Sequence, residues 1–238
     1  MICAAPLLAA PIARSGPLRI SLIEVYSSEG CGSCPPAEEW VSKLSGSPGL
    51  WKNFVPVVFH VDTWDYLGWK DVYSEKRFTV RQKSYAEFWK NGNIYTPSFV
   101  LNGREWRDWY KHGAAEFYQR EKVGDLFIER MQDDRFKVSF APQGKNRSQD
   151  SWMVHVALLG FDLISDIKSG ENSGQQLKHD FTVIQYAEET MKQFETDLFE
   201  SKVVLKLPLS FSSKELAIAA WVSQGPDPEP LQATGAYL

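Results

Sequence analysis

The chain has 238 residues, of which 43% are hydrophobic and 24% are charged, and its formal net charge is −4 at pH 7. This length allows one large domain or two small ones, and the mild negative charge gives no reason to expect nucleic acid or an anionic membrane as a partner. The chain's 3 cysteines are too few for a fold held together by disulfides.

Residues 1–16 are rich in Ala and Leu and are interrupted by Pro6 and Pro11. They resemble the apolar part and end of a secretory signal whose basic beginning is missing, but a disordered N-terminal tail explains them equally well. The sequence does not show whether they are cleaved. No segment of the chain is long and apolar enough to span a bilayer. We therefore expect a soluble protein without stable membrane insertion that is periplasmic or secreted.

Residues 17–132 alternate between strand and helix patterns. The pattern predicts strands over 19–27 and 54–62, helices over 34–46, 74–90 and 113–132, and a hairpin over 96–106. Two prolines open the first helix, where they are tolerated, and Asn102-Gly103 is a strong hairpin turn. This order indicates an α/β, thioredoxin-like domain; an unrelated α/β domain is the alternative.

Residues 133–238 read instead as strands separated by polar loops. The predicted strands cover 135–141, 152–160, 180–188, 202–209 and 215–223. Their length and spacing predict a β-rich, sandwich-like second domain. The expected organisation is thus a tail over 1–16, a thioredoxin-like domain over 17–132 and a β-rich domain over 133–238.

Cys31 and Cys34 form a CxxC pair between the first predicted strand and the following helix. Unpaired N–H groups and the dipole at a helix start favour the thiolate, and they lower the pKa of the first cysteine from about 8.5. We expect Cys31 to be the exposed, attacking sulfur and Cys34 to be the resolving one. Gly32 and Ser33 carry no charge and leave the redox potential to their surroundings.

Thr96 and Pro97 begin the predicted hairpin. In thioredoxin-like folds a proline at this position is cis, and the residue before it offers backbone groups to an extended peptide. We therefore expect Thr96 and Pro97 to face Cys31 and to position the substrate. An ordinary trans proline at the start of an edge strand is the alternative, and the sequence does not determine the isomer.

His60 and Asp62 lie at the end of the second predicted strand. Parallel strands end at the same edge of a sheet, so both residues are expected near the cysteine loop. His60 would raise the thiolate fraction of Cys31 or carry its proton, and Asp62 would orient His60. In the alternative interpretation, His60 packs within the strand and Asp62 caps the next loop.

Trp64, Tyr66 and Trp69 follow directly and are candidates for an aromatic platform beside the sulfurs, although aromatic clusters more often belong to a core. A structural zinc site needs four ligands, and one CxxC supplies two. We therefore expect no metal and no other cofactor. Copper or zinc handling through Cys31, Cys34 and His60 is kept as an alternative.

Several motifs together resemble one family. They are Tyr26–Ala37 around the CxxC, His60–Asp65, Tyr95–Pro97, and the later segments "SGENSG" and "LKHDFTVIQ". On these motifs the chain is identified as a member of a bacterial family of secreted or periplasmic thioredoxin-like proteins of unknown function. The resemblance covers about residues 20–238. It implies a thioredoxin-like fold with an appended β domain and export, but no substrate.

The first functional hypothesis is thiol–disulfide exchange in the bacterial cell envelope, on a thiol- or disulfide-containing protein or a small thiol. Exchange proceeds through a mixed disulfide without a dissociable cofactor, and a redox partner protein restores the pair. The alternative is a non-catalytic binding module in which the cysteines form a structural disulfide. The sequence gives neither the substrate, the direction of electron flow, the role of the β-rich half nor the oligomeric state.

Overall fold

An eight-stranded sheet runs through the molecule and contains strands from both halves of the chain. The computed structural model describes residues 10–111, 117–144, 151–207 and 216–238. The sheet order is β15-β14-β8-β11-β3-β2-β4-β5. These strands are β2 (Ser21–Ser27), β3 (Phe54–His60), β4 (Ser98–Leu101), β5 (Arg104–Glu105), β8 (Trp152–Gly160), β11 (Thr182–Thr190), β14 (Leu216–Gln224) and β15 (Pro230–Tyr237).

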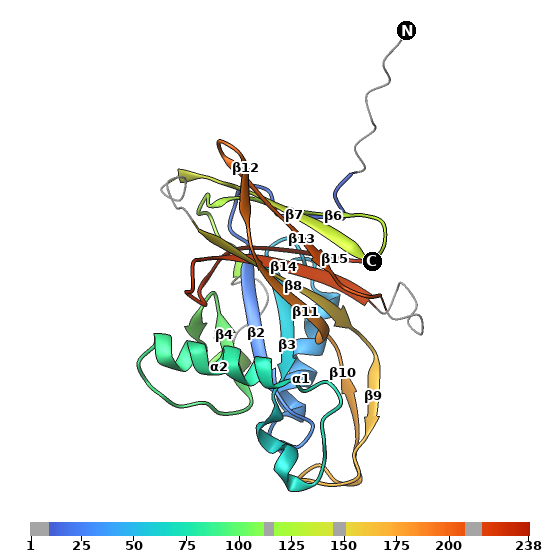
Figure 1. The fold of residues 1–238 in the computed structure, drawn as a ribbon. Coiled ribbons are helices and arrows are strands. Elements are labelled where there is room, and N and C mark those ends of the chain that lie inside the picture. Colours follow the sequence, from blue (N-terminus) through green and yellow to red (C-terminus); the bar gives the residue numbers. More distant parts are fainter. Residues whose placement is uncertain (1–9, 112–116, 145–150, 208–215) are drawn as a thin grey trace.

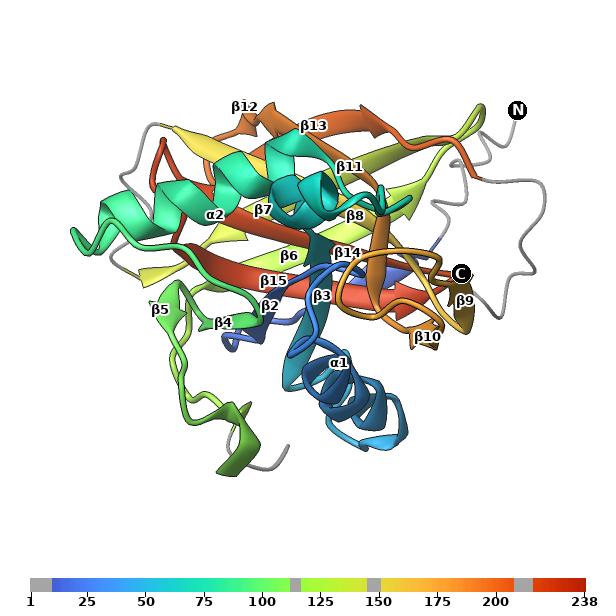
Figure 2. The same cartoon turned by 90° about the horizontal axis from the view of Figure 1, so that it is seen from below.

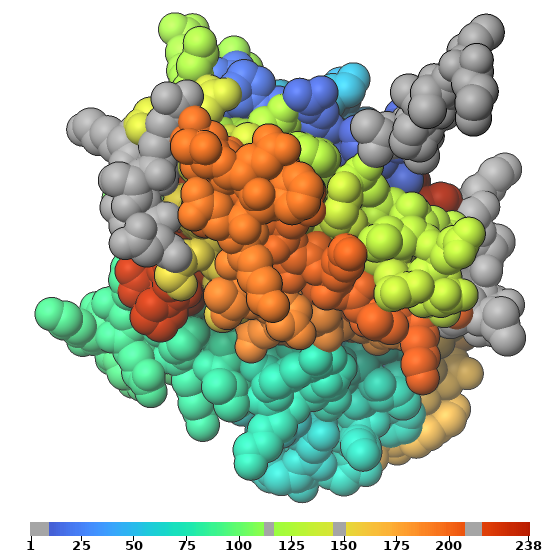
Figure 3. Space-filling model, turned by 45° about the horizontal axis from the view of Figure 1, so that its top comes forward, coloured from blue at the N-terminus to red at the C-terminus, as the bar shows by residue number. Residues whose placement is uncertain are grey.

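A five-stranded sheet packs on one face of the eight-stranded sheet (Figures 1 and 2). Its strands are, in order, β1 (Ala13–Arg14), β6 (Gly124–Arg130), β7 (Arg135–Pro142), β13 (Leu198–Val204) and β12 (Lys192–Glu195). In Figure 3, β12 and β13 (orange) cover the face turned to the viewer, above the teal segment that contains η2 and α2.

Residues of β8 show how two cores lie on opposite faces of the large sheet. Val154 and Val156 contribute to the core between the sheets, whereas Ala157 and Leu159 contribute to the other core. Successive side chains of a strand point to opposite faces, so a strand buried on both sides is apolar throughout. The second core is completed by the helical side of the molecule.

The helical elements lie mainly in the first half of the chain. They are α1 (Pro35–Ser42), η1 (Lys43–Gly46), η2 (Asp62–Leu67), α2 (Lys76–Phe88) and η3 (Trp109–Lys111). A separate hairpin of β9 (Leu163–Asp166) and β10 (Gln176–His179) extends beside α1 (Figure 1). Within the described residues, no helix is long and apolar enough to cross a membrane.

The predicted fold class, an α/β thioredoxin-like domain followed by a β-rich domain, is wrong. The structure is a mostly β, sandwich-like fold, because β11, β8, β14 and β15 extend the sheet that contains β2 and β3. Within this sheet β3 lies between β2 and β11, and all seven of its residues are buried. The large sheet crosses the boundary predicted near residue 132; the division into two domains stays a prediction.

The helix predicted over 113–132 is also wrong in the part that the structure describes. Residues Gly124–Arg130 form β6, in which Leu126 and Ile128 are buried at a spacing of two. Residues 112–116 lie outside the described residues. The apolar run in "DLFIE" is too short for its sequence pattern to distinguish a strand from a helix. The pairing of β6 with β7 shows that it is a strand. The earlier elements, from β2 to the Asn102-Gly103 turn, are confirmed.

Candidate functional site

The cysteine pair lies where two parallel strands end. β2 and β3 pair in register from Ser21 with Phe54 to Ser27 with His60, so both carboxyl ends open on one edge of the sheet. The chain then turns through residues 28–33 and enters α1. Cys34 is the N-cap of α1, and its carbonyl accepts hydrogen bonds from Ala37 and Glu38 N–H. Prolines follow in the first helical turn, where no N–H donor is needed.

Both sulfurs are free thiols, and both residues are buried. Cys31 is 0% exposed, so the expectation of an exposed attacking sulfur is wrong. The next two residues, Gly32 and Ser33, are exposed on the outside of the turn. Cys31 Sγ lies 3.3 Å from Ser33 Oγ and 3.7 Å from the Thr96 carbonyl oxygen.

The two thiols differ in acidity. A hydrogen bond from Cys34 lowers the pKa of Cys31 to about 6, against the opposing effect of burial, and Ser33 and Thr96 add to the lowering. Burial and the neighbouring Cys31 raise the pKa of Cys34. Cys31 is therefore the thiolate at neutral pH, and Cys34 is the protonated partner that stabilises it.

The Thr96 carbonyl oxygen lies beside Cys31 Sγ, as predicted, and the Thr96–Pro97 peptide bond is cis; the role of Pro97 in positioning a substrate stays a prediction. Trp64 Nε1 donates a hydrogen bond of 2.7 Å to Thr96 Oγ1. Trp64, Tyr66 and Thr96 line one cavity of about 300 Å³. Tyr66 is 77% exposed, whereas Trp69 does not line this cavity and donates a hydrogen bond of 2.6 Å to Glu29 Oε2. Two of the three proposed platform residues thus lie together beside Thr96.

His60 is buried, and its partner is Asp71 rather than Asp62. His60 Nδ1 lies 2.7 Å from Asp71 Oδ2, while the Asp62 carboxylate accepts a hydrogen bond from Thr79 Oγ1. Burial opposes the charged imidazole, but Asp71 and Glu38 raise the pKa of His60 above its usual value. His60 is connected to Cys34 rather than to Cys31, through Glu38 and Ser27.

Two residues of the β9–β10 loop hold the cysteine turn and were not identified from the sequence. Asn172 Nδ2 donates to the carbonyl oxygens of Glu29 and Cys31, at 2.8 and 3.0 Å. Glu171 Oε2 accepts a hydrogen bond of 2.7 Å from Gly32 N–H. A Cβ at Gly32 would lie 2.9 Å from this oxygen, so glycine permits the contact. The segment "SGENSG" was noted as a motif, without a role.

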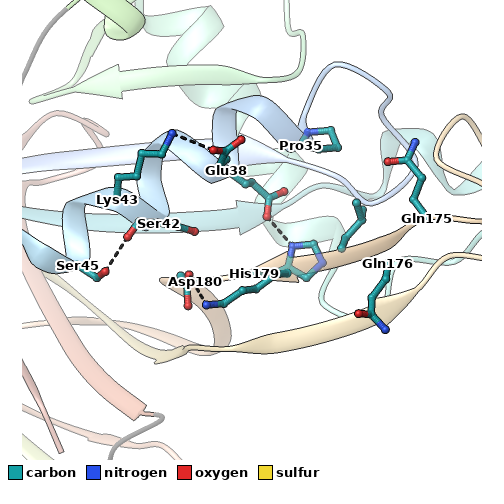
Figure 4. Close-up of a pocket in the computed structure, with 12 residues that line it drawn as sticks. Pro35, Glu38, Ser42, Lys43, Ser45, Gln175, Gln176, His179 and Asp180 are labelled. Atoms are coloured by element: carbon teal, nitrogen blue, oxygen red, sulfur yellow. Dashed lines mark hydrogen bonds and ion pairs between the residues drawn. The ribbon is translucent and has the colours of Figure 1, made fainter.

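A buried ionic cluster lies on the far side of Cys34. Ser27 Oγ donates to Glu38 Oε1, and Glu38 Oε2 lies 2.5 Å from His179 Nδ1 (Figure 4). Burial works against the charge of His179, but Glu38 and Glu29 raise its pKa to about 10. Glu38 and His179 were not proposed from the sequence, because they are 141 residues apart and neither stands in a ligand-like spacing.

Three residues of this cluster could hold a metal ion. Ligand atoms of Glu38, His60 and His179 all lie within 4.8 Å of one another, and these residues form the group found among the described residues. The set proposed from the sequence, Cys31, Cys34 and His60, is not such a group there. The possible ligands are therefore nitrogen and oxygen atoms rather than thiolates.

Comparison with known proteins gives a family and two similar structures. The model of the family described as "Protein of unknown function (DUF1223)" matches residues 22–223. A crystal structure of an Agrobacterium tumefaciens protein is 23% identical with a TM-score of 0.60, and the match covers 92% of this chain and 93% of that one. HBP35 of Porphyromonas gingivalis is 16% identical with a TM-score of 0.64, covering 94% and 76%. No curated protein matches. At these identities the two structures show a shared fold alone.

Proposed function

The chain belongs to the DUF1223 family of proteins of unknown function, and because that name assigns no activity, we propose one from the site: thiol–disulfide exchange by Cys31 and Cys34. The observation that carries the proposal is that two free cysteines lie together and that their pKa values are shifted in opposite directions. The pKa of Cys31 is lowered to about 6 while that of Cys34 is raised. Exchange needs one thiolate to attack and a second thiol held nearby to resolve.

The reaction proceeds in two displacements. The Cys31 thiolate attacks one sulfur of a substrate disulfide, the substrate S–S bond breaks, and one substrate thiolate leaves. Cys34 then gives up its proton and attacks Cys31 Sγ, which closes the intramolecular disulfide and releases the second substrate thiolate. The cysteine pair loses two electrons and the substrate gains them; the reverse sequence oxidises a dithiol.

The substrate approaches along the edge formed by Trp64, Tyr66 and Thr96. The cavity of about 300 Å³ at these residues adjoins Thr96, whose carbonyl oxygen lies 3.7 Å from Cys31 Sγ. An extended chain placed there puts its sulfur near Cys31, with aromatic faces on one side. Because Cys31 is buried, the attack requires this edge to open locally. The substrate class is a protein or small thiol, and a redox partner protein restores the pair.

The likeness to thioredoxin-like proteins is limited to this site: a cysteine pair at a helix start facing a Thr-Pro step. We further propose a location in the periplasm or outside the cell. The N-terminal sixteen residues, which resemble the end of a secretory signal, support this location. Disulfide exchange on proteins is also most common in oxidising compartments.

A second candidate is a non-catalytic binding module, and the complete burial of Cys31 favours it. In that case the pair would form a structural disulfide, and the aromatic edge would bind a partner without chemistry. The two candidates differ in whether Cys31 reacts with a disulfide in solution.

Trapping of a mixed disulfide distinguishes them. Reduced protein with Cys3→Ser is incubated with glutathione disulfide at pH 7, quenched with acid and weighed by intact mass spectrometry. The variant that carries Cys34→Ser in addition to Cys3→Ser should accumulate a glutathione adduct at Cys31, because it has no second thiol to resolve the mixed disulfide. The parent should instead form its internal disulfide, and Cys31→Ser should react far more slowly. An unreactive Cys34→Ser variant contradicts exchange and supports the binding module.

A further inference from the structure

The cluster beneath Cys34 joins three elements that are distant in sequence. Glu38 comes from α1, His60 from the end of β3 and His179 from the end of β10. None of the three side chains is more than 6% exposed. Figure 4 shows Glu38 and His179 facing each other across the space between α1 and the β9–β10 hairpin. Neither Cys31 nor Cys34 belongs to the cluster.

His60 is held in the orientation of a metal ligand. Its Nδ1 is bound to Asp71, whose carboxylate also accepts hydrogen bonds from the backbone N–H of Glu29 and Tyr73. A histidine that donates Nδ1–H to a carboxylate presents the lone pair of Nε2, and metal-binding histidines almost always have such a partner. His60 Nε2 is buried without a hydrogen bond and lies 3.8 Å from Glu38 Oε1.

Two further buried atoms lack a hydrogen-bond partner. His179 Nε2 and Glu29 Oε1 form an ion pair at 3.3 Å, without the geometry of a hydrogen bond. Buried polar atoms are nearly always satisfied, so His60 Nε2, which has no hydrogen bond, is a free donor atom for a metal, beside the ion pair of His179 and Glu29. Glu29 Oε2 is already bound by Trp69, which holds this carboxylate in place.

The charge of the cluster favours a divalent cation. Three buried carboxylates, those of Glu29, Glu38 and Asp71, surround two imidazoles. With neutral imidazoles these five side chains together carry three negative charges, and one divalent cation leaves a single one. Two protons on the imidazoles balance the same charge. Buried charges require compensation of this kind, so protons and a cation compete for the site.

A path for an ion leads to the cluster. A cavity of about 540 Å³ opens between α1 and β10, and both Glu38 and His179 line it (Figure 4). Metal–ligand bonds of about 2 Å place two ligand atoms roughly 3.3 Å apart. Ligand atoms now within 4.8 Å of one another therefore need only a small contraction.

We propose that Glu38, His60 and His179 bind one divalent transition-metal ion of the zinc class, with Asp71 as the residue that orients His60. Two histidines and one glutamate are a known zinc ligand set that leaves a fourth position open. Calcium and magnesium prefer oxygen ligands alone, and two imidazoles disfavour both. The site is separate from the cysteine pair and does not depend on the proposed exchange reaction.

Zinc binding is tested in a thiol-free protein, with Cys3, Cys31 and Cys34 all changed to Ser. After treatment with a chelator, the protein is titrated with zinc at pH 8 in competition with a chromophoric chelator, and bound metal is measured by elemental analysis. We expect one zinc per chain. Asp71→Asn should weaken binding by about 10- to 100-fold, as loss of an orienting carboxylate does.

His179→Gln and His60→Gln should abolish stoichiometric binding. The matched control is His155→Gln. His155 is a buried histidine outside the cluster that contacts Tyr186 and Ser223, so this variant should bind zinc as the parent does.

Cobalt(II) added to the protein with its cysteines intact gives a test that needs no variant. Its spectrum should lack a thiolate charge-transfer band. Less than stoichiometric zinc, unchanged binding in both His→Gln variants, or a thiolate band would each overturn the proposal.

Discussion

The neighbouring Cys34 thiol has the largest effect on the acidity of Cys31. The thiol of Cys34 donates to Cys31, and this contact is the largest contribution to its lowered pKa. Ser33 and Thr96 contribute less, and burial opposes all three. Glu171, whose carboxylate accepts a hydrogen bond from Gly32 N–H, also lies beside the cysteine turn. The reactivity of Cys31 therefore depends on its resolving partner even before any disulfide forms.

Removing that donor should raise the pKa of Cys31. In the Cys3→Ser background, we expect the alkylation rate to reach half its plateau near pH 6 for the parent. In Cys34→Ala the midpoint should move towards about 8.5, which slows alkylation at pH 7 by roughly tenfold or more. Cys34→Ser keeps a donor and should remain near the parent. Equal midpoints in the parent and Cys34→Ala would show that this hydrogen bond is not the cause.

The residues of the site differ in how visible they are in the sequence. Cys31, Cys34, Thr96 and Pro97 were predictable because each stands in a short motif at the start of an element. Asn172 and Glu171 contact the cysteine turn from 139 to 143 residues away, and no local pattern marks such a contact. For the same reason Asp62, two residues from His60, was chosen over Asp71, which the loop after η2 brings to the ring.

At the scale of elements, α2 is fixed to the large sheet by a buried ion pair. Arg81 Nε lies 2.7 Å from Glu24 Oε2, and the side chains are 8% and 1% exposed. Tyr85 OH, one turn further along α2, donates to Glu24 Oε1 at 2.5 Å. Glu24 lies in the middle of β2, a position where an unpaired carboxylate would be strongly unfavourable.

Breaking this pair should destabilise the protein strongly. We expect Arg81→Ala to lower the free energy of unfolding by about 3–5 kcal/mol, because it leaves the Glu24 charge buried without its partner. The measurement is urea denaturation followed by tryptophan fluorescence. Lys43→Ala, which breaks an exposed pair with Glu39 on α1, is the control and should change stability far less. A similar small effect for both variants would contradict the account.

Local signals explain which elements were predicted correctly. The strand β2, the helix α1 and the Asn102-Gly103 turn each carry a pattern of their own. β6 does not, since "GDLFIER" suits a helix or a strand and only its pairing with β1 and β7 distinguishes them. β15 was not predicted, because "PLQATGAY" has little hydrophobic periodicity; its place beside β14 defines it.

The whole molecule is organised around β3, the strand that links its two halves. On one side β3 pairs with β2 along its full length, and on the other it meets β11 at Val58 and Thr182. The core on the helical face of the large sheet contains Phe59 from the first half of the chain together with Phe181 and Trp221 from the second. Sequence patterns identified strands on both sides of residue 132 but not that they share a sheet, since pairing between distant strands leaves no local signal.

The shared sheet predicts that the first half does not fold alone. A chain ending at residue 132 would expose the edge of β3 and the apolar residues that now pack on the second half. We expect it to show no cooperative urea transition and to bind a hydrophobic dye, whereas the full chain unfolds cooperatively. A cooperative transition and a dispersed amide spectrum for the short chain would instead support the two-domain division predicted from the sequence.

The reduction potential of the Cys31–Cys34 pair tests the central claim most directly. The protein with Cys3→Ser is equilibrated in glutathione redox buffers at pH 7, and the oxidised fraction is measured after acid trapping of free thiols. A Cys31 pKa of about 6 stabilises the reduced form, so we expect a potential between about −270 and −120 mV, within the range of exchange proteins. A disulfide that remains closed below about −300 mV would be structural and would contradict the proposed exchange.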